Sequence, residues 1–216
     1  MTNNTISEET IKRLSLYLRN LRKLKENGVE IISSDKVTKL LKVSSFQFRK
    51  DLSYFGEFGK RGVGYKVDTL IREIEKILGV NQAWKIIMVG VGRLGSALLG
   101  FEGFSRFNIN IAYAFDKDKE KIGKNRKGVK IYNVDNLEKI VKEDKIKLAI
   151  ISTPPEIAQE IVDRLVEVGI KGILNFAPVV LSVPENVSVS NVDMACELES
   201  LIFFCKEKKY IKSNGN

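Results

Sequence analysis

The sequence predicts an α/β chain in which an N-terminal winged helix-turn-helix domain precedes a Rossmann-type parallel sheet domain and a C-terminal helix. Three observations carry this prediction. The first 80 residues show three helical patterns followed by a basic, glycine-rich hairpin; a G-x-G-x-x-G motif follows a buried strand at 85–89; and the last helical stretch is apolar on more than one face. We expect the domains to span 1–80 and 81–192, with 193–216 forming a dimerisation helix and tail.

Three serines mark the starts of the first three helices. Ser7 precedes two acids and an apolar stripe that continues to Leu24. Ser34 begins a shorter helix, and Ser44 is expected to cap a third helix that ends near Phe55. A helix, a second helix, a short turn and a third helix is the order of a helix-turn-helix motif.

The third helix has one core face and one polar face. Phe48, Leu52 and Phe55 fall together at 100° per residue, and the opposite side mixes basic, polar and aromatic residues. Such a surface suits the major groove, because Arg pairs with guanine edges while Lys, Ser and Tyr hold phosphates. The residues expected to contact DNA from this helix are Ser44, Ser45, Gln47, Arg49, Lys50 and Tyr54. The alternative is an ordinary exposed helix on a basic domain.

A glycine-punctuated segment from Gly56 to Tyr65 follows. It places Lys60 and Arg61 at the tip of a predicted β-hairpin, where a basic wing reaches the minor groove, and we include Tyr65 among the expected DNA contacts. Asp68 is expected to cap the next helix, which Gly79 ends.

Composition narrows the function further. The net charge is +9, and residues 1–80 hold 16 Lys and Arg against 10 Asp and Glu, as expected of a nucleic-acid-binding module. The chain has no histidine and two cysteines, Cys196 and Cys205, which excludes the usual zinc sets and any Ser-His or Cys-His nucleophile pair. No apolar run is long enough to span a membrane, and we expect a cytoplasmic protein without a metal or a membrane partner.

The loop from Gly90 to Gly95 is the predicted pyrophosphate site. Gly90 makes a tight turn, Gly92 lets the backbone approach the phosphates, and Gly95 lets the new helix pack on its strand. The phosphates would face free N–H groups at a helix N-terminus. The cofactor residues expected here are Gly90, Val91, Gly92, Arg93, Leu94 and Gly95.

A second strand, 109–115, ends at Asp116, which is placed to bind the hydroxyls of an adenosine ribose. This acid favours NAD over NADP because it would repel a 2′-phosphate, although Lys117 and Lys119 weaken that preference. The alternative for the whole region is an ordinary glycine-rich turn beside a loop acid.

Further strands are expected at 129–132, 148–151, 172–176 and 187–192, alternating with helices as in a parallel sheet. Thr153 is expected to cap a helix that has Pro154 at its first position. Ligands bind at the carboxyl ends of such strands, so the nicotinamide half is expected to meet residues at the ends of two strands: Thr153, Pro154, Asn175, Ala177 and Pro178.

The final helix, from about Asp193 to Lys209, carries an apolar stripe of Leu198, Leu201, Ile202 and Cys205 that Phe203 and Phe204 extend. A helix that is apolar on more than one face must be buried by more than its own domain. We interpret it as a dimerisation helix that is exchanged between subunits. The alternative is that it docks on its own sheet.

Three strings, RKDLSYFGEFGKRGVGY at 49–65, GVGRLGSAL at 90–98 and GIKGILNFAPVVL at 169–181, closely resemble the Rex family of redox-sensing transcriptional repressors. The resemblance spans nearly the whole chain. It implies a winged-helix domain before a domain that binds NADH or NAD⁺, and a homodimer that exchanges its C-terminal helices. It also implies that the dimer binds double-stranded operator DNA with an inverted repeat when NAD⁺-bound or free, and that NADH releases the DNA.

Individual positions carry over from the same resemblance. Arg49 and Lys50 match the basic pair of the recognition helix, and Arg19 and Asp193 match a pair implicated in switching. Two positions depart from some members, because Phe101 stands where they have a tyrosine and Met194 where they insert a phenylalanine toward the nicotinamide. Phe101 lacks a hydroxyl for a polar switch, and Met194 can still fill the pocket.

Two other functions fit parts of the pattern. A small NAD-dependent dehydrogenase is the first, but the Y-x-x-x-K spacing of Tyr113 and Lys117 falls on a predicted strand, and proton transfer would lack histidine. A nucleoid-type DNA binder that ignores the nicotinamide is the second. We therefore expect a regulator rather than an enzyme, with no catalytic residues.

Overall fold

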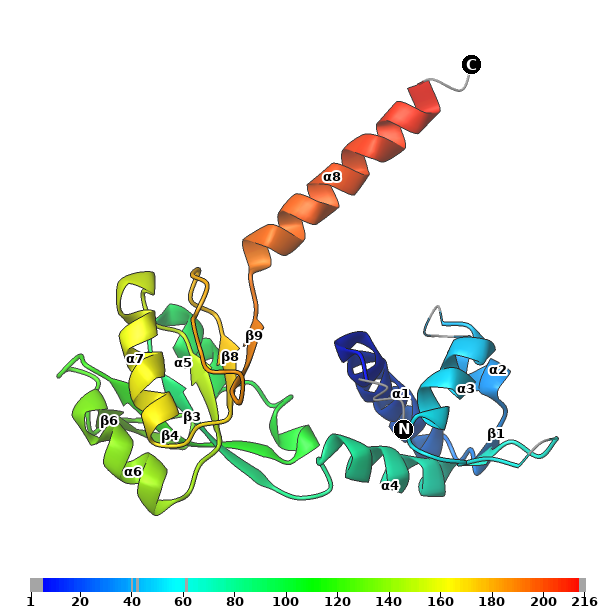
Figure 1. The fold of residues 1–216 in the computed structure, drawn as a ribbon, viewed down its shortest axis with the longest axis horizontal. Helices are drawn as coiled ribbons and strands as arrows, with labels where there is room; N and C mark the ends of the chain where they lie inside the picture. The colour runs from blue at the N-terminus through cyan, green and yellow to red at the C-terminus, as the bar shows by residue number, and fades with distance from the viewer. Residues whose placement is uncertain (1–5, 40, 42, 61, 214–216) are drawn as a thin grey trace. The chain divides into compact units, whose positions relative to one another are not determined.

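The computed structural model describes residues 6–39, 41, 43–60 and 62–213, with side chains to Lys206. The chain divides into two compact units, 1–83 and 84–216 (Figure 1). Of the predicted DNA contacts, Arg61 lies outside the described residues. In the described part of the chain, no helix is both long and apolar enough to cross a membrane.

The first unit is a winged helix-turn-helix domain. Its helices are α1 (Glu8–Glu26), α2 (Ser34–Thr38), α3 (Ser45–Ser53) and α4 (Val67–Leu78), and β1 (Ile31–Ile32) pairs antiparallel with β2 (Tyr65–Lys66). The predicted caps Ser7 and Ser44 accept hydrogen bonds from the backbone N–H groups of Thr10 and Gln47. These caps satisfy N–H groups that a helix start leaves unpaired.

The core of this unit lies between α1, α3 and α4. Leu14, Tyr17, Phe48, Leu70 and Ile74 are fully buried, and the Phe48 ring packs edge-on against Tyr17 and Tyr65. The apolar stripe predicted for α3 therefore faces the core.

The predicted cap of α4 is wrong. The N-cap is Lys66, which makes no side-chain capping bond, and Asp68 lies in the first turn, where it forms an ion pair with Lys25 at 2.7 Å. Because the carboxylate remains in the first turn, it still interacts favourably with the helix dipole.

The second unit holds a seven-stranded sheet of order β5-β6-β4-β3-β7-β8-β9, in which only β5 is antiparallel. The strands are β3 (Trp84–Val89), β4 (Ile109–Asp116), β5 (Asn125–Arg126), β6 (Val129–Asn133), β7 (Leu148–Ile151), β8 (Gly172–Asn175) and β9 (Ser188–Asn191). The six parallel strands follow the Rossmann order 3-2-1-4-5-6, so the strand order reverses beside β3.

Helices cover both faces of this sheet (Figure 1). The helical elements are α5 (Arg93–Leu99), η1 (Ser105–Phe107), η2 (Val134–Asn136), α6 (Leu137–Glu143) and α7 (Pro155–Glu167). Side chains alternate along β3, so that Ile87 and Val89 join the core under α6 and α7, whereas Ile86 and Met88 join the core under α5. The predicted βαβ succession is confirmed with two exceptions: β5 and a turn replace a helix between β4 and β6, and a loop without a helix joins β8 to β9.

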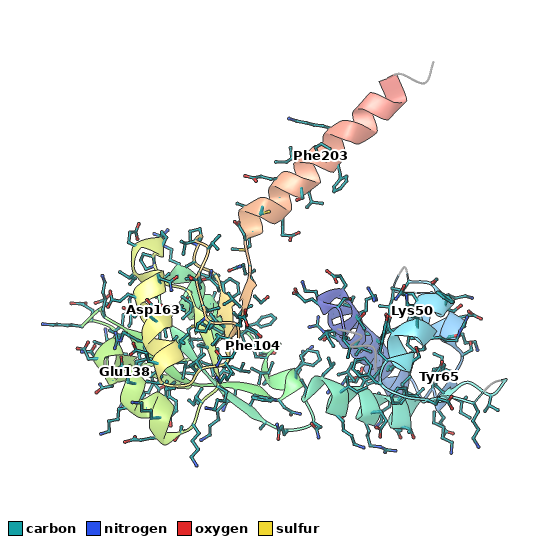
Figure 2. All side chains as sticks on the ribbon, in the orientation of Figure 1. Lys50, Tyr65, Phe104, Glu138, Asp163 and Phe203 are labelled. Carbon is teal, nitrogen blue, oxygen red and sulfur yellow. The ribbon has the colours of Figure 1, made fainter. Side chains whose placement is uncertain are left out.

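The last helix, α8 (Met194–Ser213), follows β9. Six large apolar side chains at its surface, Met194, Leu198, Leu201, Ile202, Phe203 and Phe204, are each 55–60% exposed (Figure 2 labels Phe203). These residues do not dock on the sheet of their own chain, so the alternative in which α8 packs there is not observed.

Candidate functional site

The glycine loop joins the end of β3 to the start of α5. Gly90 has φ +93°, and a Cβ there would lie 2.6 Å from the Ser152 carbonyl oxygen; at Gly95 it would lie 2.1 Å from the Gly90 carbonyl oxygen. By contrast, a Cβ at Gly92 would meet no atom within 4 Å. Gly90 and Gly95 are therefore required by the fold itself, whereas the space beside Gly92 is open to a ligand.

Ser152, immediately after β7, supports this loop. Its hydroxyl donates to the Gly90 carbonyl oxygen at 2.7 Å, and its N–H donates to the Val89 carbonyl oxygen at 2.9 Å. Because it lies at the carboxyl end of a predicted strand, Ser152 was expected, with Thr153 and Pro154, near the nicotinamide half of a dinucleotide. Its hydrogen bond to the glycine loop was not predicted.

Asp116, at the carboxyl end of β4, points back to the glycine loop. Its Oδ2 accepts the Val91 N–H at 2.8 Å and lies 3.1 Å from Lys121 Nζ, and its Oδ1 accepts the Asp118 N–H at 2.9 Å. Burial opposes ionisation, but these hydrogen bonds and the Lys121 charge outweigh it, so the pKa of Asp116 lies below its usual value. An ionised acid beside the loop suits a ribose diol.

Lys121 is a residue that sequence analysis missed, because it lies five positions beyond Asp116 and only the turn after β4 returns it to that acid. Its Nζ also lies 3.4 Å from Asp118. The cation closest to the ribose acid is thus Lys121 rather than the predicted Lys117 or Lys119.

The structure corrects the role expected of Thr153 as a helix cap. The N-cap of α7 is Pro154, and the helix begins at Pro155. Thr153 is 8% exposed, and within the described part of the chain its Oγ1 is the buried side-chain atom without a hydrogen-bond partner. A buried hydroxyl without a partner is costly. Thr153 follows β7, which lies beside β3 where the strand order reverses, so its hydroxyl suits a polar group of a ligand bound there.

Asn175 is buried at the end of β8. Its Nδ2 donates to the carbonyl oxygens of Ala177 and Val179 and to Asn191 Oδ1, and its Oδ1 accepts the Ala177 N–H. With its amide committed in this way, Asn175 shapes the loop that carries Ala177 and Pro178. Pro154 and Pro178 are exposed.

Phe101 and Met194 lie at helix ends outside the glycine loop. Phe101 follows the C-terminal end of α5, about 10 Å along the helix from Gly92, and its ring packs edge-on against Phe104 at 5.0 Å. Met194 is the first residue of α8, and its side chain is exposed. Their predicted contacts with the nicotinamide stay predictions.

The predicted DNA surface of α3 is exposed at its centre (Figure 2 labels Lys50). Arg49 and Lys50 are exposed, and Arg49 Nη1 donates to Ser34 Oγ at 2.9 Å, which holds it toward α2. Ser44 and Ser45 begin the helix and Tyr54 follows it. These side chains form the basic face of the domain, but a role in DNA binding stays a prediction for each.

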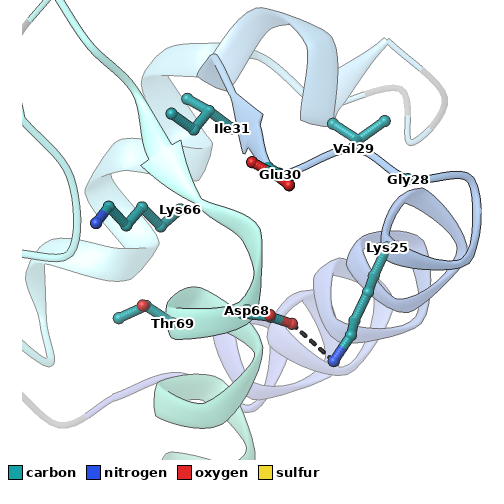
Figure 3. Close-up of a pocket in the computed structure, with 8 residues that line it drawn as sticks. All are labelled: Lys25, Gly28, Val29, Glu30, Ile31, Lys66, Asp68 and Thr69. Carbon is teal, nitrogen blue, oxygen red and sulfur yellow. Dashed lines mark ion pairs between the residues drawn. The ribbon is translucent and has the colours of Figure 1, made fainter.

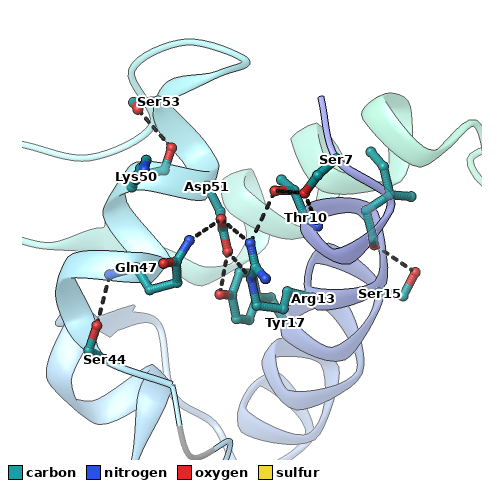
Figure 4. A network of polar contacts seen from close by, with 11 residues as sticks. Ser7, Thr10, Arg13, Ser15, Tyr17, Ser44, Gln47, Lys50, Asp51 and Ser53 are labelled. Atoms are coloured by element: carbon teal, nitrogen blue, oxygen red, sulfur yellow. Dashed lines mark hydrogen bonds and ion pairs between the residues drawn. The ribbon is translucent and has the colours of Figure 1, made fainter. Parts of the chain in front are cut away.

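Beneath that face lies a polar network that sequence analysis missed (Figure 4). Asp51 is fully buried and accepts four hydrogen bonds of 2.7 Å, two from Arg13 and one each from Tyr17 and Gln47. Burial opposes ionisation of Asp51, but these bonds outweigh it and lower the pKa of its carboxyl. The available signal was helical spacing, because Asp51 lies between Phe48 and Leu52 on the core face, where a carboxylate requires partners.

The wing is a tight turn at the end of the β1–β2 ribbon. Lys60 pairs antiparallel with Gly64, and the Lys60 carbonyl oxygen accepts the N–H groups of Val63 and Gly64. Gly64 has φ +95°, and a Cβ there would lie 2.6 Å from the Ile32 carbonyl oxygen. Lys60 is exposed on this turn, whereas the half-buried Tyr65 ring packs against Phe48.

The two residues of the expected switch lie in different units. Arg19 is exposed on α1. Asp193 is the cap of α8, where its Oδ1 accepts the N–H groups of Ala195 and Cys196 at 2.9 and 3.1 Å. Asp193 thus has a local structural role in addition to the one expected.

Two other features belong to neither surface. A pocket of about 450 Å³ lies between the end of α1 and the start of α4, beside the Lys25–Asp68 ion pair (Figure 3). Tyr113 lies on β4, as predicted, and its hydroxyl donates to Asp144 at 2.9 Å. Tyr113 is therefore not arranged with Lys117 as a catalytic pair one helical turn apart.

Comparison with known families matches both units. The family described as a putative DNA-binding protein N-terminus matches residues 5–53, and the CoA binding domain family matches residues 81–179. The chain is similar to the redox-sensing transcriptional repressor Rex of Desulfitobacterium hafniense (49% identity over 92% of this chain and 94% of that protein) and to Rex of Carboxydothermus hydrogenoformans (46% identity; 92% and 95%).

Solved structures agree over the full length. The crystal structure of RSP in complex with β-NAD⁺ and operator DNA has a TM-score of 0.91 at 33% identity and covers 99% of this chain and 100% of that one. RSP in complex with β-NADH has a TM-score of 0.86 at 32% identity, covering 98% and 99%. The relatives from Desulfitobacterium hafniense and Carboxydothermus hydrogenoformans, which are 46–49% identical over 92% of this chain, are transcriptional repressors rather than enzymes. The chain belongs to the Rex family of redox-sensing transcriptional repressors.

Proposed function

We propose that this chain is a repressor that senses the ratio of NADH to NAD⁺. The observation that carries the proposal is that one chain joins a dinucleotide-type edge, with open space at Gly92 and an ionised acid at Asp116, to a domain with an exposed basic recognition helix. The repressor binds operator DNA when it is free or holds NAD⁺, and NADH releases it. It acts in the cytoplasm.

Each part of the chain has its own function. Residues 1–80 bind DNA, residues 81–192 bind the coenzyme, and residues 193–216 join two subunits. On DNA, α3 lies in the major groove and Lys60 and Arg61 approach the minor groove. Residues at the three strand ends, Asp116, Thr153 and the loop shaped by Asn175, hold the dinucleotide, with its pyrophosphate at Gly90–Gly95.

The protein works as a homodimer, because α8 exposes six large apolar side chains that a second copy would cover. In this dimer α8 is exchanged, and Met194 of one subunit fills the space beside the nicotinamide of the other. An inverted-repeat operator matches the two-fold symmetry of such a dimer.

The coupling between coenzyme and DNA has a minimum size. A tenfold loss of DNA affinity requires NADH to bind the released arrangement about tenfold more tightly than the DNA-bound one, a coupling of about 1.4 kcal/mol. Arg19 and Asp193 pair in only one of the two arrangements and set which one NADH favours.

The test uses a duplex selected by the NAD⁺-bound protein from a random pool and labelled for fluorescence anisotropy at one salt concentration. We expect NADH to weaken binding at least tenfold while NAD⁺ does not. Equal affinity with both coenzymes would refute sensing, and steady turnover of NADH with a small oxo-acid would favour the dehydrogenase alternative.

A further inference from the structure

The buried carboxylate of Asp51 constrains a neighbour on the DNA face. Its Oδ2 accepts Arg13 Nε and the Tyr17 hydroxyl, and its Oδ1 accepts Arg13 Nη2 and Gln47 Nε2. Arg13 and Tyr17 belong to α1, whereas Gln47 lies one turn before Asp51 on α3. The carboxylate therefore joins the recognition helix to the helix behind it and also holds a residue of the outer face.

An ionised carboxylate accepts hydrogen bonds and donates none. Gln47 must therefore turn its NH₂ group toward Asp51, and its carbonyl oxygen Oε1 lies on the other side of the amide (Figure 4). The side-chain amide of most surface glutamines can turn either way, but here the hydrogen bond to the Asp51 carboxylate fixes its orientation. Gln47 is half-buried, so the rest of its amide is accessible at the surface of α3.

The accessible groups of Gln47 are then one acceptor, Oε1, and one donor, the second hydrogen of Nε2. In the major groove adenine offers the complementary pair, since its N6 amine donates and its N7 accepts. Guanine offers O6 and N7, which are both acceptors. An amide fixed in this orientation pairs with adenine and leaves Oε1 facing an acceptor at guanine.

We propose that Asp51 is a positioning residue for sequence recognition, which holds the Gln47 amide so that Gln47 recognises an adenine in each half of the operator. This inference rests on the proposed function, because it requires that α3 enters the major groove. Arg13 and Tyr17 fix the carboxylate, and the carboxylate fixes the amide. Asp51 itself is buried and does not touch DNA.

The experiment begins with the duplex selected by the wild-type protein. Each adenine of the half-sites is replaced in turn by purine, which lacks only the N6 amine. At one adenine we expect this replacement to weaken DNA binding fivefold to tenfold. This factor corresponds to the loss of a single hydrogen bond of about 1 to 1.4 kcal/mol. The Gln47→Leu variant should bind the natural duplex more weakly than wild type by a similar factor. Replacing that adenine by purine should not weaken the binding of this variant further.

Tyr17→Phe is the matched control. It removes one of the four hydrogen bonds to Asp51 and leaves the one to Gln47, so it should lower thermal stability and keep every base preference. A merely structural network predicts that all these variants lose stability without changing base preference.

Asp51→Ala tests the positioning itself. Without the carboxylate, no acceptor at Asp51 holds the NH₂ group of Gln47 inward, so the amide can turn either end toward the groove. Replacing the adenine by guanine should therefore weaken DNA binding less in this variant than in wild type. If this variant does not fold, the purine series with Gln47→Leu decides alone.

Two results would overturn the inference: purine effects that are the same in wild type and Gln47→Leu at every adenine, or a folded Asp51→Ala protein that discriminates adenine from guanine at that position as strongly as wild type does. Failure of the wild-type protein to select any duplex would instead refute the proposed function.

Discussion

Alanine substitutions at single glycines of the loop distinguish a glycine needed for coenzyme binding from a glycine needed for folding. Alanine at Gly95 would place its Cβ 2.1 Å from the Gly90 carbonyl oxygen, whereas alanine at Gly92, where φ is −73°, would meet no atom within 4 Å. The first change forces two pieces of backbone apart. The second adds a methyl group only to the space where a pyrophosphate is proposed to lie.

The magnitudes follow from these contacts. Overpacking costs about 1–3 kcal/mol, and Gly95→Ala lies at the upper end because neither backbone atom can rotate away, so the Tm of the sheet domain should fall by roughly 10 °C. Gly92→Ala should change the free energy of unfolding by less than about 1 kcal/mol, since the gain from a stiffer unfolded chain offsets a poorer N-cap. A lost charge-assisted hydrogen bond to phosphate, worth about 2 kcal/mol, should weaken NADH binding about 30-fold.

Differential scanning calorimetry of the free proteins and titration calorimetry with NADH measure both quantities. We expect Gly92→Ala to unfold like wild type and to bind NADH weakly, and Gly95→Ala to lose both stability and binding. Wild-type NADH affinity in Gly92→Ala would show that the backbone at Gly92 does not approach the coenzyme.

Four further outcomes are expected. Thr153→Val should keep or raise the stability of the free protein, because Oγ1 is buried without a partner, while NADH affinity in titration calorimetry falls about fivefold; an unchanged affinity would remove Thr153 from the site. Lys121→Ala should weaken NADPH binding about fivefold more than NADH binding, because it removes the cation beside Asp116; equal losses would contradict this role. Asp193→Ser retains a capping oxygen but no charge, so DNA release should become less sensitive to NADH in anisotropy titrations while NADH affinity is kept; wild-type sensitivity would exclude the pairing with Arg19. The pKa of Asp51 is lowered by folding, so its stabilisation of the winged-helix domain is present above about pH 4 and is lost as the pH falls through the folded-state pKa; thermal denaturation at pH 7 to pH 2.5 should show this loss, and greater stability in acid would contradict it.

Local patterns predicted most of the architecture. The apolar run before the glycine loop, the spacing of Phe48, Leu52 and Phe55, and the glycines before α5 are each patterns of neighbouring residues, and the structure confirms the elements that they predict. Capping was less predictable. Asp68 and Thr153 are residue types that commonly form N-caps, but neither caps its helix. Asp68 forms an ion pair with Lys25, and the Thr153 hydroxyl is buried without a partner among the described residues.

By itself, the sequence determined the order of the domains, the glycine loop, the acid at the end of the second strand and the family, because these depend on short-range spacing and residue type. Only the tertiary structure decided that Asp51 meets Arg13, that Lys121 returns to Asp116 and that Ser152 supports Gly90. Arg13 and Asp51, and Ser152 and Gly90, are distant in sequence, and Lys121 depends on the course of a turn. Such partners are chosen by how helices and strands pack, since a buried polar group takes the complementary group that packing places within reach.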